Sequence, residues 1–316
     1  MVKATNFAPV RVVSISAVAL VTLGAAVLDL LGAGGSQQWQ VVLAVVALAV
    51  GIPHGALDHL VTVPSMEKGK MAMFIAGYVA VASIVTFAIM LWPLWGFIGV
   101  VVMSAVHFGM GDASFIRQSL QPRAKTVPWW LYAVPAGAVP VFIPLTKHGS
   151  EEALALVNQE LVGWHFGFDP QLFWVTLFVA LFAIVWLVVS RHLAAAIDLA
   201  TLLSLVLLAP PLVAFAAYFG LWHAFRHTAR LSLELPKAAL VVEAGHWLKA
   251  MWVVTRPGLP ALFGTMAIAA VITFFTDLRL ADYFFVALAV VWALTVPHMA
   301  LTWRLDREAL ELSRGY

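Results

Sequence analysis

The sequence predicts an all-α polytopic integral membrane protein, a helical bundle of about 8–10 transmembrane helices with both termini in the cytoplasm. Three observations support this prediction. Of the 316 residues, 63% are hydrophobic and only 11% are charged, whereas a soluble domain carries about 25% charged residues. The apolar residues gather in runs of roughly 20, the length that crosses a bilayer as a helix. The loops between these runs alternate between basic character and acidic or neutral character.

About ten runs meet the length criterion for a spanning helix. The first has an apolar core longer than the roughly 7–15 residues of a signal peptide, so it predicts a retained anchor. Prolines interrupt the fifth run and the seventh is short, so eight spans remain if both are re-entrant. The charged segment 237–256 predicts an interfacial helix or a loop. In chain order the runs cover residues 11–31, 39–62, 71–92, 95–117, 128–146, 171–190, 193–209, 211–232, 258–276 and 282–304.

The loop charges predict the orientation of these helices. Basic residues precede the first run and follow every even-numbered run, whereas the loops of opposite parity are acidic or neutral. By the positive-inside rule, the basic loops and both termini face the cytoplasm, which predicts a multi-pass protein of the cytoplasmic cell membrane. Neither a soluble domain nor an internal repeat stands out, so residues 1–316 are expected to form a single transmembrane domain.

Composition also excludes several classes of function. The chain contains no cysteine, which rules out disulfides, iron–sulfur clusters and thiolate zinc sites. The formal net charge is only +2 and the basic residues are scattered through loops, so nucleic-acid binding has no support. Thirteen tryptophans suit a protein with two lipid–water interfaces.

The clearest candidate for chemistry is the segment Trp222-His223-Ala224-Phe225-Arg226-His227, inside an apolar run. His223 and His227 are four residues apart, so they share one face of a helix. Two neutral imidazoles at this spacing can bind one metal ion.

Histidines also lie well inside three other runs, and all of these runs are even-numbered. Counted from the outer start of each helix, His54, His107, His223 and His298 lie at depths of roughly 18–24 Å. A single intramembrane histidine is more often a hydrogen-bonded packing residue than a ligand. Several at one depth, with one pair on a common face, favour a shared metal site.

Two carboxylates and one further histidine accompany this set. Asp58 lies one turn after His54, and Asp112 follows His107. A metal-bound imidazole usually donates its other N–H to a carboxylate or a carbonyl, so both aspartates are candidates for that supporting role, as is His59. Alternatively, the aspartates cap helix ends or pair with arginines.

Histidines without cysteine suit iron, copper, zinc or nickel, and ligand type alone does not choose among these metals. Aromatic side chains near the histidines predict an apolar cavity, and Phe108, Phe219, Trp222 and Phe225 are candidates to line it. Alternatively, these rings pack the core. An apolar cavity suits a hydrocarbon substrate that arrives from the bilayer. A hydrocarbon offers nothing for a Lewis acid to polarise, so oxygen activation at iron is the chemistry we expect.

Four motifs together resemble the Brp/Blh family of membrane β-carotene 15,15′-dioxygenases. They are the segment Pro53-His54-Gly55-Ala56-Leu57-Asp58-His59, the segment His107-Phe108-Gly109 with Asp112, the segment Trp222–His227, and Pro297-His298-Met299. The resemblance implies an Fe(2+) enzyme that adds O2 across the central double bond of β-carotene and yields two molecules of all-trans-retinal. It also implies a functional link to a retinal-binding rhodopsin.

By this resemblance, the metal ligands fall on His54, His107, His223 and His227. The same set omits His298, which the depth comparison includes, so His298 is interpreted as a supporting or substrate-facing residue. Two alternatives remain open on the sequence alone. A divalent-metal or proton transporter could use the same histidines, and a membrane di-iron desaturase or hydroxylase also gathers histidines at helix ends. The latter class needs about eight clustered histidines, and this chain has one HxxxH pair.

Overall fold

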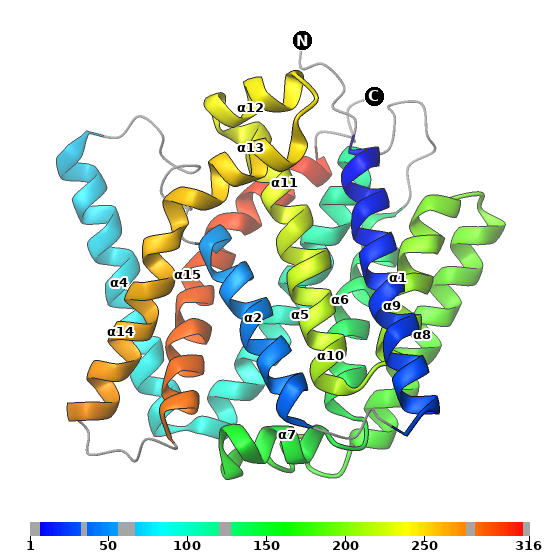
Figure 1. Cartoon of the computed structure of the whole chain (residues 1–316), viewed down its shortest axis with the longest axis horizontal. Helices are drawn as coiled ribbons and strands as arrows, with labels where there is room; N and C mark the ends of the chain where they lie inside the picture. Colours follow the sequence, from blue (N-terminus) through cyan, green and yellow to red (C-terminus); the bar gives the residue numbers. More distant parts are fainter. Residues whose placement is uncertain (1–6, 33–36, 56–66, 120–127, 276–281, 312–316) are drawn as a thin grey trace.

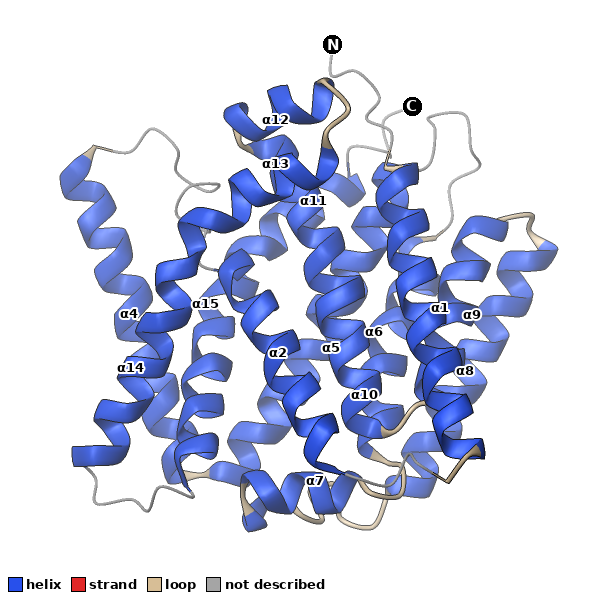
Figure 2. Cartoon of the chain, in the orientation of Figure 1, coloured by secondary structure: helices blue, strands red, loops and turns tan. Residues whose placement is uncertain are grey.

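The computed structural model describes residues 7–32, 37–55, 67–119, 128–275 and 282–311. Within these residues every regular element is a helix, and short loops join the helices (Figure 2). The helices, in chain order, are α1 (Ala8–Leu30), α2 (Gln37–Gly55), α4 (Lys68–Leu91), α5 (Pro93–Ser119), α6 (Trp129–Leu145), α7 (Ser150–Val157), η1 (Gln159–Leu161), α8 (Asp169–Val189), α9 (Leu193–Leu208), α10 (Pro211–Ala216), the π-helical segment η2 (Ala217–Ala224), α11 (Phe225–Glu234), α12 (Pro236–Glu243), α13 (Trp247–Thr255), η3 (Arg256–Gly258), α14 (Leu259–Phe275) and α15 (Tyr283–Glu311).

The chain is a polytopic helical membrane protein, as the sequence predicts. Among the described residues, six helical stretches are long and apolar enough to cross a bilayer, and the pair α6–α7, bent by 82°, raises the number to seven if it is one span. Shorter or broken helices account for the remaining predicted runs: the apolar stretches of α2 and α9 are short, and α10–η2–α11 is divided into three segments. Large apolar side chains cover the outer surface of the bundle, as expected for lipid contact.

The segment 237–256 departs from the sequence-based expectation. Its first half forms the short helix α12, which fits an interfacial helix. Its second half is α13, which continues through η3 into α14 as one apolar stretch of 29 residues, Trp247–Phe275. The departure is this continuity with α14; the interfacial position expected for α13 stays a prediction.

The centre of the bundle is built on α5 and α6, which make the most extensive contact between any two described helices. Two glycines allow this approach: a Cβ atom on Gly109 would collide with the backbone carbonyl of Ala133, and one on Gly137 would collide with that of Ala105. Most of α6 is buried despite its three internal prolines. A proline in a buried membrane helix is tolerated where neighbouring helices satisfy the carbonyls that it frees.

The ends of α1 and α15 indicate a common side for the described ends of the chain. α1 begins, and α15 ends, at the edge of the bundle that also carries α12 and α13 (Figure 1). An even number of crossings is consistent with this arrangement. That this edge faces the cytoplasm stays a prediction from the loop charges.

Candidate functional site

The helices that carry the predicted histidines run in the same direction. α2, α5, α10–η2–α11 and α15 all start at the edge that bears α7 and run towards the edge that bears α12 (Figure 1). Their parallel orientation confirms the expectation that the histidine-bearing helices share one polarity, and it brings residues of similar depth to one level.

Four histidine rings meet inside the bundle, one each from α5, η2, α11 and α15. The centroid of the His107 ring lies 5.0 Å from that of His223, 6.3 Å from that of His227 and 5.3 Å from that of His298. The His227 ring lies 5.7 Å from the His298 ring. All four side chains are buried, with 2–7% of their surface exposed. We call these four rings the histidine cluster.

His223 and His227, in the predicted run 211–232, lie on one helical face as predicted. The rings of His223 and His227 lie 6.0 Å apart with an angle of 11° between their planes, so both project from one face. The helix, however, is not a regular α-helix: His223 belongs to the π-helical segment η2, and His227 follows in α11. π-helical turns are rare and often occur at functional sites.

His298 belongs to the cluster as fully as the other three, which agrees with the depth comparison. Its helix also supports His107, because the Thr302 hydroxyl lies 3.4 Å from Nδ1 of His107 and 3.1 Å from the carbonyl oxygen of His298. Pro297 precedes His298 inside α15 and removes one backbone N–H from the helix.

His54 is placed by its backbone only. It lies in the last turn of α2, and a Cβ atom built on the next residue, Gly55, would be 3.5 Å from Nδ1 of His298. The C-terminal end of α2 therefore reaches the cluster. The side chain of His54 and the whole of Asp58 and His59 lie outside the described residues, so their predicted roles stay predictions.

The cluster suits a divalent transition metal by the chemistry of its donors. Imidazole nitrogens bind such ions at about 2.1 Å, so the centroids of rings around one ion lie about 5 Å apart. The two shortest separations in the cluster, 5.0 and 5.3 Å, match that value. The others are slightly longer, and no group of three or more histidine or acidic side chains among the described residues already has the geometry of a metal site.

Two of the predicted aromatic residues flank the cluster. The Phe108 ring lies 4.5 Å from the His223 ring, and the Phe219 ring lies 6.2 Å from it in a stacked arrangement. Phe219 also covers Gly51 of α2, where a Cβ atom would collide with its ring. Phe225, by contrast, packs in a separate apolar cluster with Phe7 and other side chains of α1 and α13.

Trp222 and Asp112 form a polar contact beside the cluster. The indole N–H of Trp222 donates a hydrogen bond of 2.9 Å to the Asp112 carboxylate, and the Tyr218 hydroxyl lies 3.3 Å from the same oxygen. Trp222 is completely buried. Asp112 thus holds the π-helical segment that carries His223, which is a different contact from the expected hydrogen bond to a metal-bound imidazole.

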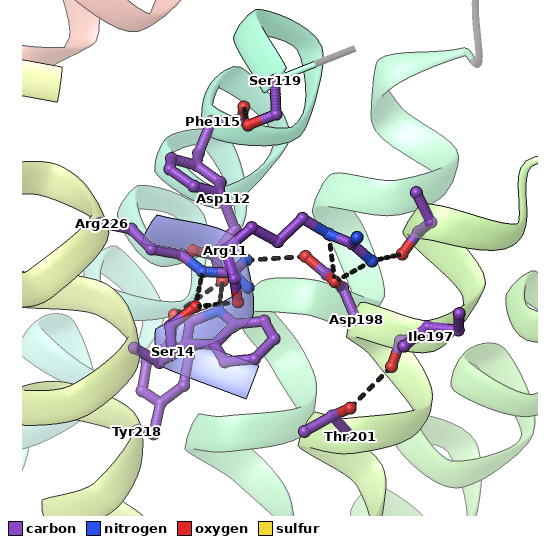
Figure 3. A network of polar contacts seen from close by, with 12 residues as sticks. Arg11, Ser14, Asp112, Phe115, Ser119, Ile197, Asp198, Thr201, Tyr218 and Arg226 are labelled. Carbon is purple, nitrogen blue, oxygen red and sulfur yellow. Dashed lines mark hydrogen bonds and ion pairs between the residues drawn. The ribbon is translucent and has the colours of Figure 1, made fainter. Parts of the chain in front are cut away.

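A buried ion-pair network joins Arg226 to residues of α1 and α9 (Figure 3). The Arg226 guanidinium lies 3.4 Å from the centre of the Trp222 ring, pairs with Asp198 of α9 at 2.7 Å and donates to Ser14 of α1 at 2.9 Å. Arg11 pairs with the other Asp198 oxygen at 2.7 Å. From the sequence, Arg226 could reach either the lipid headgroups or Asp58; in the structure it is 1% exposed and pairs with Asp198 inside the bundle.

A second buried pair fixes the same helix one turn later. Arg230 pairs with Asp306 of α15 at 2.6 Å and donates to the Gln118 side chain of α5 at 2.8 Å. The sequence analysis named neither Asp198 nor Asp306. The signal for Asp198 was available, because a carboxylate within a short apolar run requires a partner at membrane depth.

Two apolar cavities lie on the outside of α4. The larger, of about 620 Å³, is lined by residues of α4, α5 and α15, and the smaller, of about 450 Å³, by residues of α4 and α15. Both include Val296 of α15, two residues before His298. Apolar pockets of this size typically hold small hydrophobic molecules.

Comparison with known proteins identifies the family. Residues 45–306, which contain every residue of the histidine cluster, match the family model of β-carotene 15,15′-dioxygenase. A curated relative, "Beta-carotene 15,15'-dioxygenase" of an uncultured marine bacterium 66A03, is 26% identical over an alignment of 275 residues that covers 80% of this chain and 88% of the relative. No solved structure matches. A buried histidine cluster in an apolar bundle and a family match over most of the sequence lead to one assignment: this chain belongs to the β-carotene 15,15′-dioxygenase family and is an oxidoreductase that cleaves carotene.

Proposed function

We propose that the enzyme binds Fe(2+) at its histidines and uses O2 to cleave β-carotene at the central 15,15′ double bond, giving two molecules of all-trans-retinal. The observation that supports this most strongly is the group of buried imidazoles at one level of an apolar bundle. Four neutral nitrogen donors suit iron(II). A carotene has no polar group on which a hydrolytic metal could act.

The proposed ligands are His54, His107, His223 and His227. Bound there, iron would supply the activation of O2. The His298 ring lies 5.3 Å from the His107 ring, a distance between those of His223 and His227, and we place His298 beside the ligands, facing the substrate. The rest of the chain excludes water, because the cluster is buried. It also holds the rings in place through Thr302 and Asp112.

The aromatic side chains have a separate proposed role. Phe108 and Phe219 flank His223 and offer ring faces to an apolar polyene. Positive charge that develops on the polyene during oxidation is stabilised by such faces. Trp222 contributes through Asp112 and Arg226, because its buried indole fixes the helix that carries the histidine pair.

The reaction balances without a further reductant. The central carbon–carbon double bond breaks, and each of its carbons takes one oxygen atom of O2 as an aldehyde. The carotene is oxidised and O2 is reduced, with no proton released. The product, retinal, is the chromophore of retinal-binding rhodopsins, so we propose such a rhodopsin as the functional partner. Substrate and product both dissolve in the lipid bilayer, which suits a multi-pass protein of the cell membrane.

The test is expression of the chain in a bacterium that accumulates β-carotene, followed by extraction of pigments and purification for metal analysis. The wild-type chain should bleach the cells, form retinal and retain iron. His107→Ala, His223→Ala and His227→Ala should lose both iron and retinal formation. His246→Ala, which changes an exposed histidine, should behave as the wild type. Full iron content together with full retinal formation in His223→Ala would refute the proposal.

Isotopically labelled O2 tests the dioxygenase stoichiometry. The retinal is reduced to the alcohol as it forms, so that its oxygen no longer exchanges with water. One labelled atom per product molecule is expected. Label in only half of the product molecules would indicate that one oxygen comes from water, and the dioxygenase assignment of this step would then be wrong.

A further inference from the structure

The larger apolar cavity lies where α4, α5 and α15 meet, and these three helices contact one another in pairs. Its volume is about 620 Å³. The lining contains no charged side chain, and the only side-chain polar atoms are the two indole nitrogens. The lining residues are Ile84, Val85, Ala88, Ile89, Trp92, Trp95, Gly96, Gly99, Val100, Met103 and Val296.

The cavity opens towards the side of the bundle. At its outer edge, Ile84, Trp92 and Trp95 are 69%, 59% and 64% exposed, and they belong to the apolar surface that faces lipid. The two tryptophans stand at the turn between α4 and α5, the position of an interfacial aromatic belt. A molecule that reaches this cavity therefore comes from the bilayer and not from water.

The cavity and the histidine cluster share two helices, α5 and α15. Gly99, Met103 and His107 are four residues apart from one to the next, so they lie on one face of α5 in consecutive turns. On α15, Val296 lines the cavity and His298 is two residues further. The same stripe of α5 that forms the wall of the cavity thus ends at a ring of the cluster.

The length of this stripe fits one arm of a long polyene. From Trp95 to His107 the rise along α5 is about 18 Å, roughly half of a bilayer core or slightly more. A substrate that is cut at its centre must place half of its length on one side of the reacting bond. An arm that lies along this stripe, with its outer end beside Trp92 and Trp95, would place the central bond at the histidines.

We propose that the cavity between α4, α5 and α15 is the membrane-side binding site for one arm of the carotene, which enters laterally from the lipid. The proposal rests on carotene cleavage as the activity. In this site Gly99 leaves room for the polyene because it has no side chain. A Cβ atom on Gly99 meets no other atom within 4 Å, so this position borders open space and is not needed for helix packing.

Gly99→Phe tests the site because the new side chain fills the cavity without displacing a neighbouring helix. Gly24→Phe is the matched control: Gly24 is a glycine of the exposed face of α1 whose Cβ atom would also meet nothing within 4 Å. The purified proteins are assayed for β-carotene consumption and for iron. Gly99→Phe should lower kcat/KM at least about tenfold with iron content unchanged, and Gly24→Phe should match the wild type.

Binding without turnover gives the second readout. In a His223→Ala background, which is expected to be inactive, carotene that co-purifies with the protein is measured by its absorption. The additional Gly99→Phe change should reduce the bound carotene at least about tenfold, and the additional Gly24→Phe change should leave it unchanged. If Gly99→Phe does not accumulate in the membrane, Gly99→Leu replaces it in both assays.

The outcomes separate this proposal from the assigned activity. Wild-type protein that consumes no carotene would contradict the activity itself. Normal cleavage and normal carotene binding in Gly99→Phe, with an active wild type, would overturn the cavity proposal and leave the activity intact. An equal loss in Gly24→Phe would also overturn it, because the effect would then come from a bulky residue anywhere on the lipid face.

Discussion

Replacing Asp198 with asparagine should destabilise the bundle strongly although the side chain keeps its size. Asp198 is fully buried and pairs with Arg226 and Arg11 at 2.7 Å each. The amide cannot neutralise either guanidinium. Arg226 is 1% exposed and would keep its hydrogen bond to Ser14 and its contacts with the Trp222 and Phe115 rings, but it would lose the carboxylate that neutralises it.

The expected cost comes mainly from Arg226. Removing one partner of a buried ion pair costs about 3–5 kcal/mol, because the remaining charge stays buried without compensation. Arg11 is 20% exposed, so solvent screens it and its share is about 1 kcal/mol or less. At about 2 °C per kcal/mol for a chain of this size, the melting temperature should fall by about 6–10 °C.

The assay is thermal unfolding of the purified protein in detergent, followed by circular dichroism. Glu308→Gln is the control, since it removes a carboxylate from an exposed pair with Arg304 and should shift the midpoint by about 1 °C or less. The double variant Asp198→Leu with Arg226→Met should be more stable than Asp198→Asn, because the fully buried Arg226 charge is removed together with its partner and only the part-exposed Arg11 is left unpaired. A shift in Asp198→Asn no larger than that of Glu308→Gln would refute the reasoning.

Three further predictions concern the surroundings of the site. Thr302→Val removes the hydroxyl next to His107 and should weaken iron binding about tenfold with little change in melting temperature, as measured by competition with a chelator; unchanged affinity would remove Thr302 from the site. Gly109→Ala should cost about 1–3 kcal/mol because its methyl group meets the backbone of α6, whereas Gly24→Ala should be neutral or stabilising; equal melting temperatures would contradict the close contact of α5 and α6. Lys147→Met removes three hydrogen bonds, at 2.8–3.0 Å, to carbonyls near the end of α9 and should speed amide exchange in the last turn of that helix; unchanged exchange would show that water replaces the ammonium group at little cost.

The sequence alone predicted much of the bundle, because each apolar run is a local property. The i,i+4 spacing of His223 and His227 required only helical geometry, and their rings do lie on one face. The depth comparison brought His107 and His298 to the same level, since parallel helices of similar length align their interiors. The family resemblance alone does not include His298, whose ring lies in the cluster.

The polar partners were harder to predict, because they depend on which helices become neighbours. The sequence shows that Arg226 is an ionisable residue in an apolar run, but nothing local indicates whether its partner is a headgroup, Asp58 or Asp198. Asp112 presented the same ambiguity, and its contact with Trp222 involves two helices more than 100 residues apart in the chain. The continuity of α13 with α14 was also missed, because Lys249 and Arg256 divide the apolar residues around them.

The π-helical segment η2 divides one long helix into two halves, α10 and α11, that contact different neighbours. Below it, α10 packs against α2; above it, Arg226 and Arg230 fix α11 to α9 and α15. An extra residue in a π turn rotates all that follows by about 100° relative to a continuous α-helix. Each half can therefore pack against its neighbours at its own rotation about the helix axis, because the π turn supplies the difference in angle between them. The direction of the His227 side chain is thus set by the ion pairs of α11. It can stay the same while the packing of the apolar helix α10 changes.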